Sequence, residues 1–329
     1  MMMTRMPAFA IIFAMSATAR TARLATSQEL QVALIQQCLA AVNEVILGKS
    51  EVTATVFATV LARGSILIED RPGLGKTTLA KSIAKILGLK FQRVQCTNDL
   101  LPMDILGRVA LRNPSGEAPP SAAAAEPQLI EGPIFASVVI LDELNRAPAR
   151  TQSAFLQAME EGEVTIEGVT KALPTPQIII ATQNPTDHIG TTLLPESELD
   201  RFTVGVRMGY PAREFEKVIL RNGVQEKLER LSVQMSAYEL TTLQNAAHAI
   251  KTSDTFLDLV VRFLEAARQS GKFLSSRAGR DLVRLAKAFA LMEGRDFALP
   301  EDFKRSIRPV VQHRVRDADE LAQNFSFNV

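Results

Sequence analysis

Short apolar runs alternate with helical repeats along the first part of the chain. An apolar run at residues 65–68 ends in a Gly-rich turn, after which Leu79, Ile83 and Leu87 recur at helical spacing ahead of Gly88. Further apolar runs of strand length occupy residues 91–95, 138–141, 178–181 and 204–208. The segments between them are long enough for crossover helices. The pattern therefore predicts a five-stranded parallel sheet covered by helices on both faces, which is a three-layer α/β fold.

The pattern changes further along the chain. Runs of strand length stop, and only a 3.6-residue period remains, as in Leu282, Leu285 and Phe289. We therefore predict two domains. Residues 26–210 would form the αβα domain, and residues 211–329 a smaller, all-helical domain.

Two stretches fall outside this pattern. An apolar run that follows Arg5 imitates a short signal peptide but is too short to span a bilayer, so we expect residues 1–25 to be a disordered or mis-started leader. Structured protein is expected to begin with the capping-box pattern of residues 26–29. Residues 113–125 are rich in Pro and Ala without an amphipathic period, which predicts an exposed insertion. The rest of the sequence contains no candidate membrane span.

Composition narrows the classes of protein. The 329 residues carry 37 basic and 36 acidic side chains, a net charge of +1, so no overall field attracts nucleic acid or an anionic membrane. Aromatic residues make up only 5%, too few to suggest base-stacking surfaces. The two cysteines, Cys38 and Cys96, fit buried thiols in a reducing compartment. A cytoplasmic protein that binds no nucleic acid is expected.

A phosphate-binding loop is the first candidate site. Residues 70–78 read Asp-Arg-Pro-Gly-Leu-Gly-Lys-Thr-Thr and lie between a predicted strand and its helix, where backbone N–H groups and the helix dipole can hold a phosphate chain. Lys76 would reach the β and γ phosphates of ATP, and Thr77 would hold Mg²⁺. The strict pattern has Gly where this chain has Asp70. The residues expected around ATP are Pro72, Gly73, Leu74, Gly75, Lys76, Thr77 and Thr78.

A pair of carboxylates is the second candidate site. Asp142 and Glu143 follow the apolar run 138–141, and buried carboxylates at a strand end are costly unless they meet a cation or solvent. Asp142 suits Mg²⁺ coordination, largely through water. Glu143 points the other way at strand spacing and is suited to polarise the attacking water as a general base.

Residues 142–162, which begin Asp-Glu-Leu-Asn-Arg-Ala-Pro, closely resemble the MoxR family of AAA+ ATPases. Four further segments share the resemblance, namely residues 73–77 with the helix that follows, 100–105, 181–185 and 194–202. The resemblance covers roughly residues 40 to 315. It implies a P-loop AAA+ core with a small helical lid domain, a ring assembly that we expect to be a hexamer, and work on protein partners, with von Willebrand factor A domain proteins as the expected class.

The resemblance also implies roles for three polar residues. Asn184 resembles sensor 1, which orients the lytic water or contacts the γ-phosphate; alternatively it forms a turn before Pro185. Arg201 resembles the arginine finger that completes the site of a neighbouring subunit, with a surface ion pair as the alternative. Arg277 resembles sensor 2, which contacts phosphate within its own chain, with a solvated arginine in the first turn of a helix as the alternative.

Other segments match parts of the family that surround the site. The apolar segment at residues 45–48, with Val45, Ile46 and Gly48, resembles the one that packs against adenine. Residues 99–135 resemble an element inserted within helix 2, and residues 162–168 alternate like a hairpin. Both of these would lie where a ring touches its client.

The function predicted is hydrolysis of ATP to ADP and phosphate, coupled to chaperone-like remodelling or activation of protein partners. Three alternatives stay open. The first is an ATPase subunit of the magnesium-chelatase type, and the second is a nucleic-acid motor, which the balanced charge disfavours. The third is a nucleotide-gated scaffold that hydrolyses little ATP because Asp70 perturbs the loop.

Overall fold

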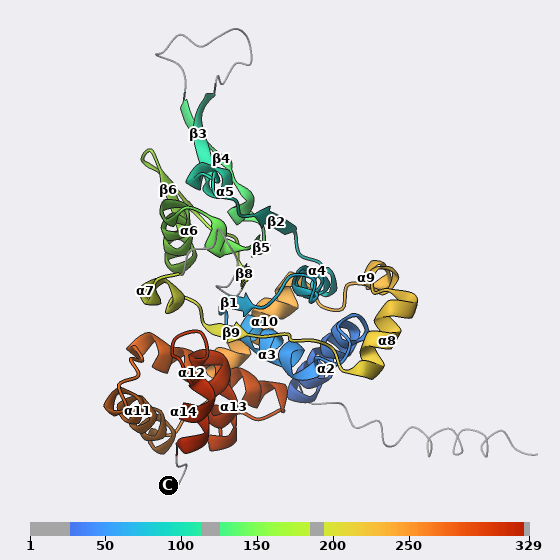
Figure 1. The fold of residues 1–329 in the computed structure, drawn as a ribbon, viewed down its shortest axis with the longest axis vertical. Coiled ribbons are helices and arrows are strands. Elements are labelled where there is room, and N and C mark those ends of the chain that lie inside the picture. The colour runs from blue at the N-terminus through green and yellow to red at the C-terminus, as the bar shows by residue number, and fades with distance from the viewer. Residues whose placement is uncertain (1–26, 113–125, 185–193, 326–329) are drawn as a thin grey trace, which may run out of the picture.

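The computed structural model describes residues 27–112, 126–184 and 194–325. The predicted leader, residues 1–25, and the Pro- and Ala-rich segment 113–125 lie outside the described residues. Helix α2 begins at Ser27, where the capping-box pattern predicted a helix start. Figure 1 shows the sheet between helices α2 to α4 and the tall part of the molecule formed by α5, α6 and two hairpins.

A five-stranded parallel sheet forms the centre of the molecule, as the apolar runs predicted. Its strands stand in the order β2-β5-β8-β1-β9, and neighbours pair in parallel throughout. Their bounds are β1 (Ile66–Glu69), β2 (Phe91–Gln95), β5 (Val138–Asp142), β8 (Ile178–Gln183) and β9 (Val204–Val206). Because the strands are parallel, their carboxyl ends meet at one edge, which is where α/β proteins place ligands.

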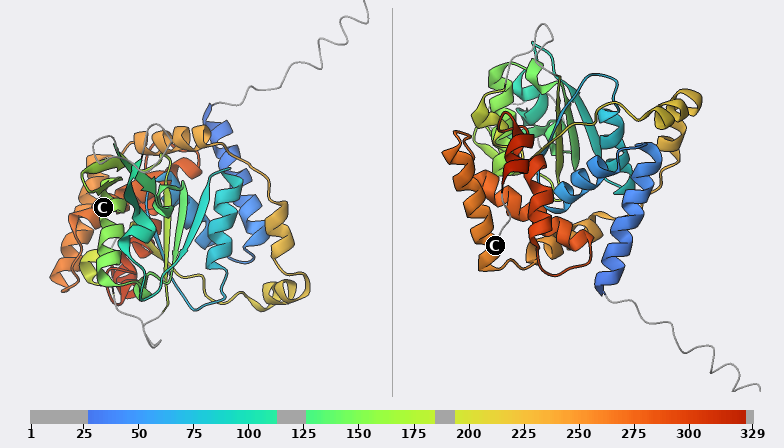
Figure 2. Two further views of the ribbon diagram at one scale, coloured as in Figure 1. Left: turned by 90° about the horizontal axis from the view of Figure 1, so that it is seen from above. Right: turned by 60° about the horizontal axis from the view of Figure 1, so that its bottom comes forward.

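Helices cover both faces of this sheet (Figure 2). Ile66 and Ile68 of β1 face a core shared with α2 (Ser27–Val45), α3 (Ser50–Leu61) and α4 (Lys76–Ile86), whereas Leu67 faces a second core with α6 (Ala149–Glu161). All five residues of β5 are buried, as expected for a strand that is covered on both faces. The three-layer α/β prediction is confirmed. Cys38 and Cys96 are buried free thiols within these cores.

The predicted insertion contains structure that the sequence pattern did not reveal. Its described parts are the short helix α5 (Pro102–Leu106), strands β3 (Gly107–Arg112) and β4 (Glu126–Glu131), and the 3₁₀ turn η1 (Pro133–Phe135). Strands β3 and β4 pair antiparallel and project away from the main sheet (Figure 1). The second hairpin was predicted, and β6 (Glu163–Ile166) and β7 (Val169–Ala172) form it beside α6.

The chain after β9 is helical, as predicted. Serine caps begin three of its helices, because Ser236, Ser253 and Ser275 each accept a hydrogen bond from a first-turn backbone N–H. The described helices of this part of the chain are α8 (Arg213–Asn222), α9 (Gln225–Arg230), α10 (Ala237–Ala249), α11 (Asp254–Gln269), α12 (Ser276–Met292), α13 (Pro300–Val311) and α14 (Ala318–Asn324). One apolar core runs on from α2 into these helices, and the domain boundary near residue 210 stays a prediction.

The three residues that follow α13 bind the main chain of β9 and of the turn before it. Arg314 donates to the carbonyl oxygens of Asp200, Phe202 and Thr203 at 2.7–3.2 Å. A ring nitrogen of His313 lies 2.9 Å from the Phe202 carbonyl oxygen, and Gln312 donates to the carbonyl of Gly205. Three consecutive side chains thus fasten the helical part of the chain to one edge of the sheet.

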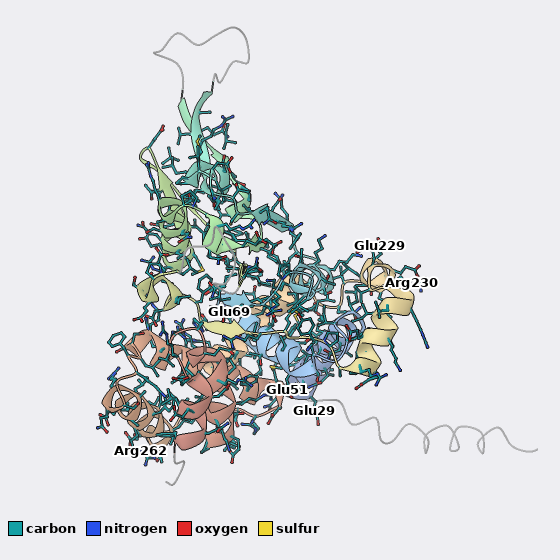
Figure 3. The ribbon with its side chains drawn as sticks, in the orientation of Figure 1. Glu29, Glu51, Glu69, Glu229, Arg230 and Arg262 are labelled. Carbon is teal, nitrogen blue, oxygen red and sulfur yellow. The ribbon has the colours of Figure 1, made fainter. Side chains whose placement is uncertain are left out.

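Charged side chains lie on the exterior. Glu29, Arg230 and Arg262 lie exposed on their helices, among the charged side chains labelled in Figure 3. Within the described ranges, no helix is both long and apolar enough to cross a bilayer.

Candidate active site

Two glycines shape the loop between β1 and α4. Gly73 and Gly75 have φ angles of 84° and 85°, a conformation that side chains with a Cβ rarely adopt. Helix α4 begins at Lys76, directly after Gly75. Unpaired N–H groups of its first turn therefore face the loop, where an anionic ligand would be stabilised.

Lys76 lies at the centre of the site, with only 8% of the residue exposed. Its Nζ donates to the Asp70 carbonyl oxygen at 2.6 Å and to Asn184 Oδ1 at 3.3 Å. Burial lowers the pKa of the Lys76 ammonium, and the carboxylates of Asp70, Asp142 and Glu143 oppose that shift. The ammonium therefore lies in a field of negative charge and is fixed in place by two hydrogen bonds.

Asp142 ends β5 and gathers three partners. Its Oδ2 accepts from Thr77 at 3.2 Å and pairs with Arg93 Nε of β2 at 2.6 Å, while Oδ1 accepts from Thr182 of β8 at 3.2 Å. A hydroxyl oxygen and a carboxylate oxygen next to the loop are the donor types that Mg²⁺ prefers. Thr77 and Asp142 thus fit a magnesium ion, as the sequence suggested, and Arg93 is a cationic partner that the sequence did not reveal.

Glu143 takes a left-handed backbone conformation, with φ of 58°, immediately after the strand. Non-glycine residues adopt this region uncommonly, and such strain gathers at functional sites. The Glu143 carboxylate accepts from Asn184 Nδ2 at 3.0 Å and Gln95 Nε2 at 3.3 Å, and it pairs with Arg146 at 3.0 Å. Three donors from three different elements therefore hold it in one orientation.

A cavity of about 580 Å³ lies beside the loop. The loop residues 72–78 line one wall, and Val45 and Ile46 line another, so the structure brings the predicted adenine segment to the predicted phosphate loop. Gly48, also predicted to lie around ATP, is not among the described lining residues of this cavity; it packs against α8, where a Cβ on Gly48 would lie 2.4 Å from the Phe215 ring. The wall that the sequence did not predict comes from the linker after β9 and from α8, through Met208, Gly209, Tyr210, Ile219 and Leu220.

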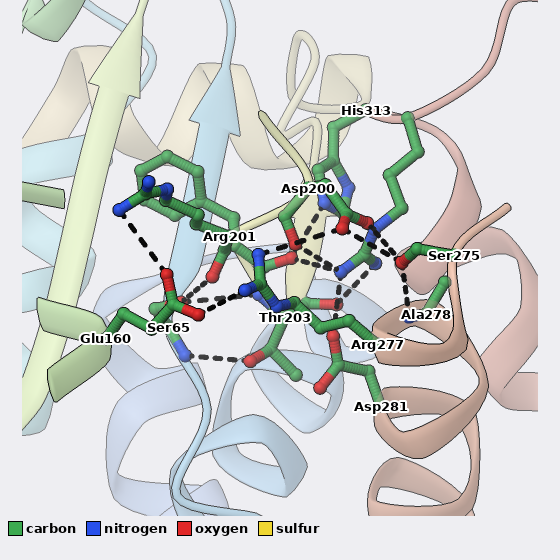
Figure 4. Close-up of polar contacts among 12 residues, drawn as sticks. Ser65, Glu160, Asp200, Arg201, Thr203, Ser275, Arg277, Ala278, Asp281 and His313 are labelled. Atoms are coloured by element: carbon green, nitrogen blue, oxygen red, sulfur yellow. Dashed lines mark hydrogen bonds and ion pairs between the residues drawn. The ribbon is translucent and has the colours of Figure 1, made fainter. Parts of the chain in front are cut away.

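Arg201 and Arg277 occupy a different place. Both pair with the Glu160 carboxylate at the end of α6, Arg201 at 3.3 Å (Figure 4). Both line the same two cavities, whereas the described lining of the 580 Å³ cavity includes neither. The resemblance implied a phosphate contact from Arg277 within its own chain, but the structure places Arg277 beside Arg201. The carboxylate that joins them, Glu160, was not identified from the sequence.

An ion-pair network lies behind these two arginines (Figure 4). Asp200 accepts from the Ser275 hydroxyl at 2.9 Å and pairs with Arg314 Nε at 2.8 Å. Arg314 also pairs with Asp281 at 2.7 Å. Burial raises the pKa of the Asp281 carboxyl to about 6, although the charge and hydrogen bond of Arg314 act to lower it. The network connects α12 and α13 to the turn that carries Arg201.

Two segments of the chain match known families. Residues 65–204 match the ATPase family associated with various cellular activities (AAA), and residues 272–326 match the AAA lid domain. The first match contains the loop and both carboxylates. The second contains Arg277 and Arg314.

Individual proteins are similar over most of the chain. YeaC of Bacillus subtilis is 36% identical over 288 residues, which is 86% of this chain and 87% of YeaC. Chaperone MoxR1 of Mycobacterium tuberculosis is 33% identical over 310 residues, or 90% of this chain and 79% of MoxR1. The crystal structure of a presumed ATPase from Cytophaga hutchinsonii superposes with a TM-score of 0.76 at 27% identity, covering 96% of this chain and 95% of that one.

Proposed function

The chain belongs to the MoxR family of AAA+ ATPases, and on this premise we propose that it hydrolyses ATP to ADP and phosphate at the loop of residues 70–78. One observation carries the proposal. Asn184 contacts both Lys76 and Glu143, so a single side chain links the group suited to bind phosphate with the group suited to activate water. A loop that only joined a strand to a helix would not need this bridge.

Each polar residue then has a chemical role. Glu143 accepts a proton from water as the water oxygen attacks the γ-phosphorus, and the bond to the bridging oxygen of ADP breaks. Asn184 orients that water, and Lys76 balances charge on the phosphates. Thr77 and Asp142 would hold Mg²⁺, which would neutralise phosphate charge when bound.

We propose further that the chain works as a ring, with a hexamer expected, and that Arg201 reaches the ATP of a neighbouring subunit. In support, Arg201 lines cavities other than the one beside its own loop. Arg277 shares Glu160 with Arg201, so we assign Arg277 to the same neighbouring site. This revises the contact within one chain that the family resemblance implied.

The biological role that we propose is chaperone-like remodelling or activation of protein partners in the cytoplasm. The similar MoxR1 is named a chaperone. Proteins with a von Willebrand factor A domain are the proposed partner class, by analogy with the family. The β3–β4 and β6–β7 hairpins, which lie side by side, are the proposed contact with the client.

The direct test is phosphate release by the purified full chain with ATP and Mg²⁺. Turnover that requires Mg²⁺ and is lost in Glu143→Gln is the expected result. A chain that binds ATP but releases no phosphate at any protein concentration would contradict hydrolysis and favour a nucleotide-gated scaffold. Affinity purification of Glu143→Gln with bound ATP would identify the partner, because this variant should hold its client.

A further inference from the structure

Asp70 stands at the first position of the phosphate loop, where the strict motif has glycine. Its carboxylate binds two backbone N–H groups, one inside the loop and one outside it. Asp70 Oδ2 accepts a hydrogen bond from the backbone N–H of Gly209 at 2.6 Å, and Oδ1 accepts from the N–H of Arg71 at 2.9 Å. The backbone N–H of Asp70 donates to the Gln183 carbonyl oxygen at 3.1 Å. The side chain thus joins the loop to a segment far along the chain.

The segment that Asp70 holds is the linker after β9, residues 208–211. This linker forms a wall of the 580 Å³ cavity. Lys49 holds it from the other side, through a hydrogen bond of 2.6 Å from Nζ to the Tyr210 carbonyl oxygen. Helix α8 begins at Arg213, so the position of the linker also sets where α8 meets the cavity.

The charge of the Asp70 carboxylate acts in two directions, because it favours the charged form of the Lys76 ammonium but lies beside a site for anions. A carboxylate beside a site for phosphates repels the ligand, so its removal should strengthen nucleotide binding on Coulomb grounds. A hydrogen bond from a backbone N–H to a carboxylate is, however, among the stronger ones, and its loss would release the wall. The two effects predict changes of opposite sign in nucleotide affinity, so an experiment can separate them.

We propose that Asp70 is a positioning residue for nucleotide binding, which holds residues 208–211 against the phosphate loop and so completes the cavity. The inference rests on the proposed function, because it assumes that the cavity binds ATP. It has an unexpected consequence: restoring the strict motif with Asp70→Gly weakens nucleotide binding instead of improving it.

The test compares Asp70→Gly and Asp70→Asn with the natural full chain, by titration of a fluorescent ADP analogue with Mg²⁺. Asparagine keeps an oxygen that can accept from Gly209 but removes the charge. We expect the Kd to rise about tenfold in Asp70→Gly, the effect of losing one charge-assisted hydrogen bond, and to stay within about twofold in Asp70→Asn. Glu69→Gln is the matched control, since Glu69 is the neighbouring carboxylate and pairs at 2.6 Å with the side chain of Arg207, directly before the linker, instead of accepting from a linker N–H. Its Kd should be unchanged or slightly lower.

Hydrogen–deuterium exchange reports the contact itself. The Gly209 amide should exchange faster in Asp70→Gly and stay protected in Asp70→Asn, in proteins that melt at the same temperature. Equal or tighter binding by Asp70→Gly would overturn the inference, and so would equal weakening of both variants. If the natural chain binds no nucleotide, the proposed function fails first and the inference fails with it.

Discussion

The side-chain amide of Asn184 donates to Glu143 Oε1 at 3.0 Å, while its oxygen accepts from Lys76. Because Asn184 contacts both functional groups, its loss should disturb their alignment while leaving Lys76 and Glu143 themselves in the site. We expect Asn184→Ala to bind nucleotide within a few-fold of the natural protein and to lower kcat by about 10²-fold, the usual size of one positioned donor. Parallel measurements of nucleotide Kd and phosphate release test this. A large loss of binding would show instead that Asn184 contributes mainly to the affinity for nucleotide.

Lys76 and Glu143 should fail in different ways. Lys76→Ala removes the charge that meets the phosphates, so we expect nucleotide binding to be lost. Glu143→Gln keeps the shape of the side chain but cannot accept the proton, so binding should persist while kcat falls by about 10²- to 10⁴-fold. Nucleotide titration and single-turnover hydrolysis separate the two. Equal loss of binding in both variants would contradict the assigned roles.

Arg201 and Arg277 are expected to act between subunits. Arg201→Ala should bind ATP and hydrolyse it about 10³-fold more slowly, and mixing it with inactive Lys76→Ala protein should restore some turnover, because an intact loop can then lie opposite an intact arginine. Arg277→Ala should be rescued in the same way if it belongs to the neighbouring site. ATPase rates across mixing ratios, with subunit exchange verified by labelled protein, provide the measurement.

The control for this mixture is Glu143→Gln with Lys76→Ala. Each variant is defective in the site of its own chain, so no arrangement of a mixed ring creates an intact site and turnover should stay absent. If subunits exchange and the Arg201 mixture is equally inactive, Arg201 does not act in a neighbour. If mixing with Lys76→Ala restores turnover to Arg201→Ala but not to Arg277→Ala, Arg277 acts at the site of its own chain.

Arg93 should influence the magnesium requirement. Its Nε lies 2.6 Å from the same Asp142 oxygen that contacts Thr77, so a cation held there must compete with the guanidinium. We expect Arg93→Gln to reach half-maximal ATPase activity at a lower Mg²⁺ concentration. Arg146→Gln, which removes a cation from Glu143 instead, is the comparison. An unchanged Mg²⁺ curve in Arg93→Gln would show that Arg93 does not compete.

Asp281 makes a prediction about pH. Its pKa is about 6 in the folded protein against 3.8 ordinarily, so the folded state binds the proton more tightly than the unfolded state. The free energy of unfolding therefore falls as the pH rises from about 4 to 6. Asp281→Asn should therefore be more stable than the natural protein at pH 8 and equal to it near pH 4. Asparagine still offers Arg314 an acceptor, and Arg314 keeps the Asp200 carboxylate and four carbonyl groups. Urea unfolding at both pH values tests this. A variant less stable at pH 8 would show that the ion pair outweighs desolvation.

The sequence predicted the features that depend on residues close together along the chain. Apolar runs located the five strands, and the loop and the Asp142–Glu143 pair were visible because their chemistry lies within one short segment. Contacts between distant segments were not visible. Arg93 and Thr182 reach Asp142 only through strand pairing. Glu160 reaches Arg201 and Arg277 only because the fold places the end of α6 beside both the turn before β9 and the start of α12.

The sequence predicted the insertion and the role of Asp70 only in part, because both depend on contacts between distant segments. Composition marked the insertion as exposed, but the β3–β4 hairpin depends on pairing across residues 113–125. Asp70 looked like a defect in a motif, because its partner Gly209 is contributed by a linker that no local pattern connects to the loop.

The hydrogen bonds from Arg314 to residues 200–203 have a consequence for how this part of the molecule can move. Its guanidinium binds three carbonyl groups of the turn that carries Arg201, and it is fixed to α12 through Asp281. A rotation of these helices relative to the turn would break several hydrogen bonds at once. We therefore expect these helices and Arg201 to move together, so that in the proposed ring a displacement of the helices would also displace the arginine offered to the neighbouring subunit.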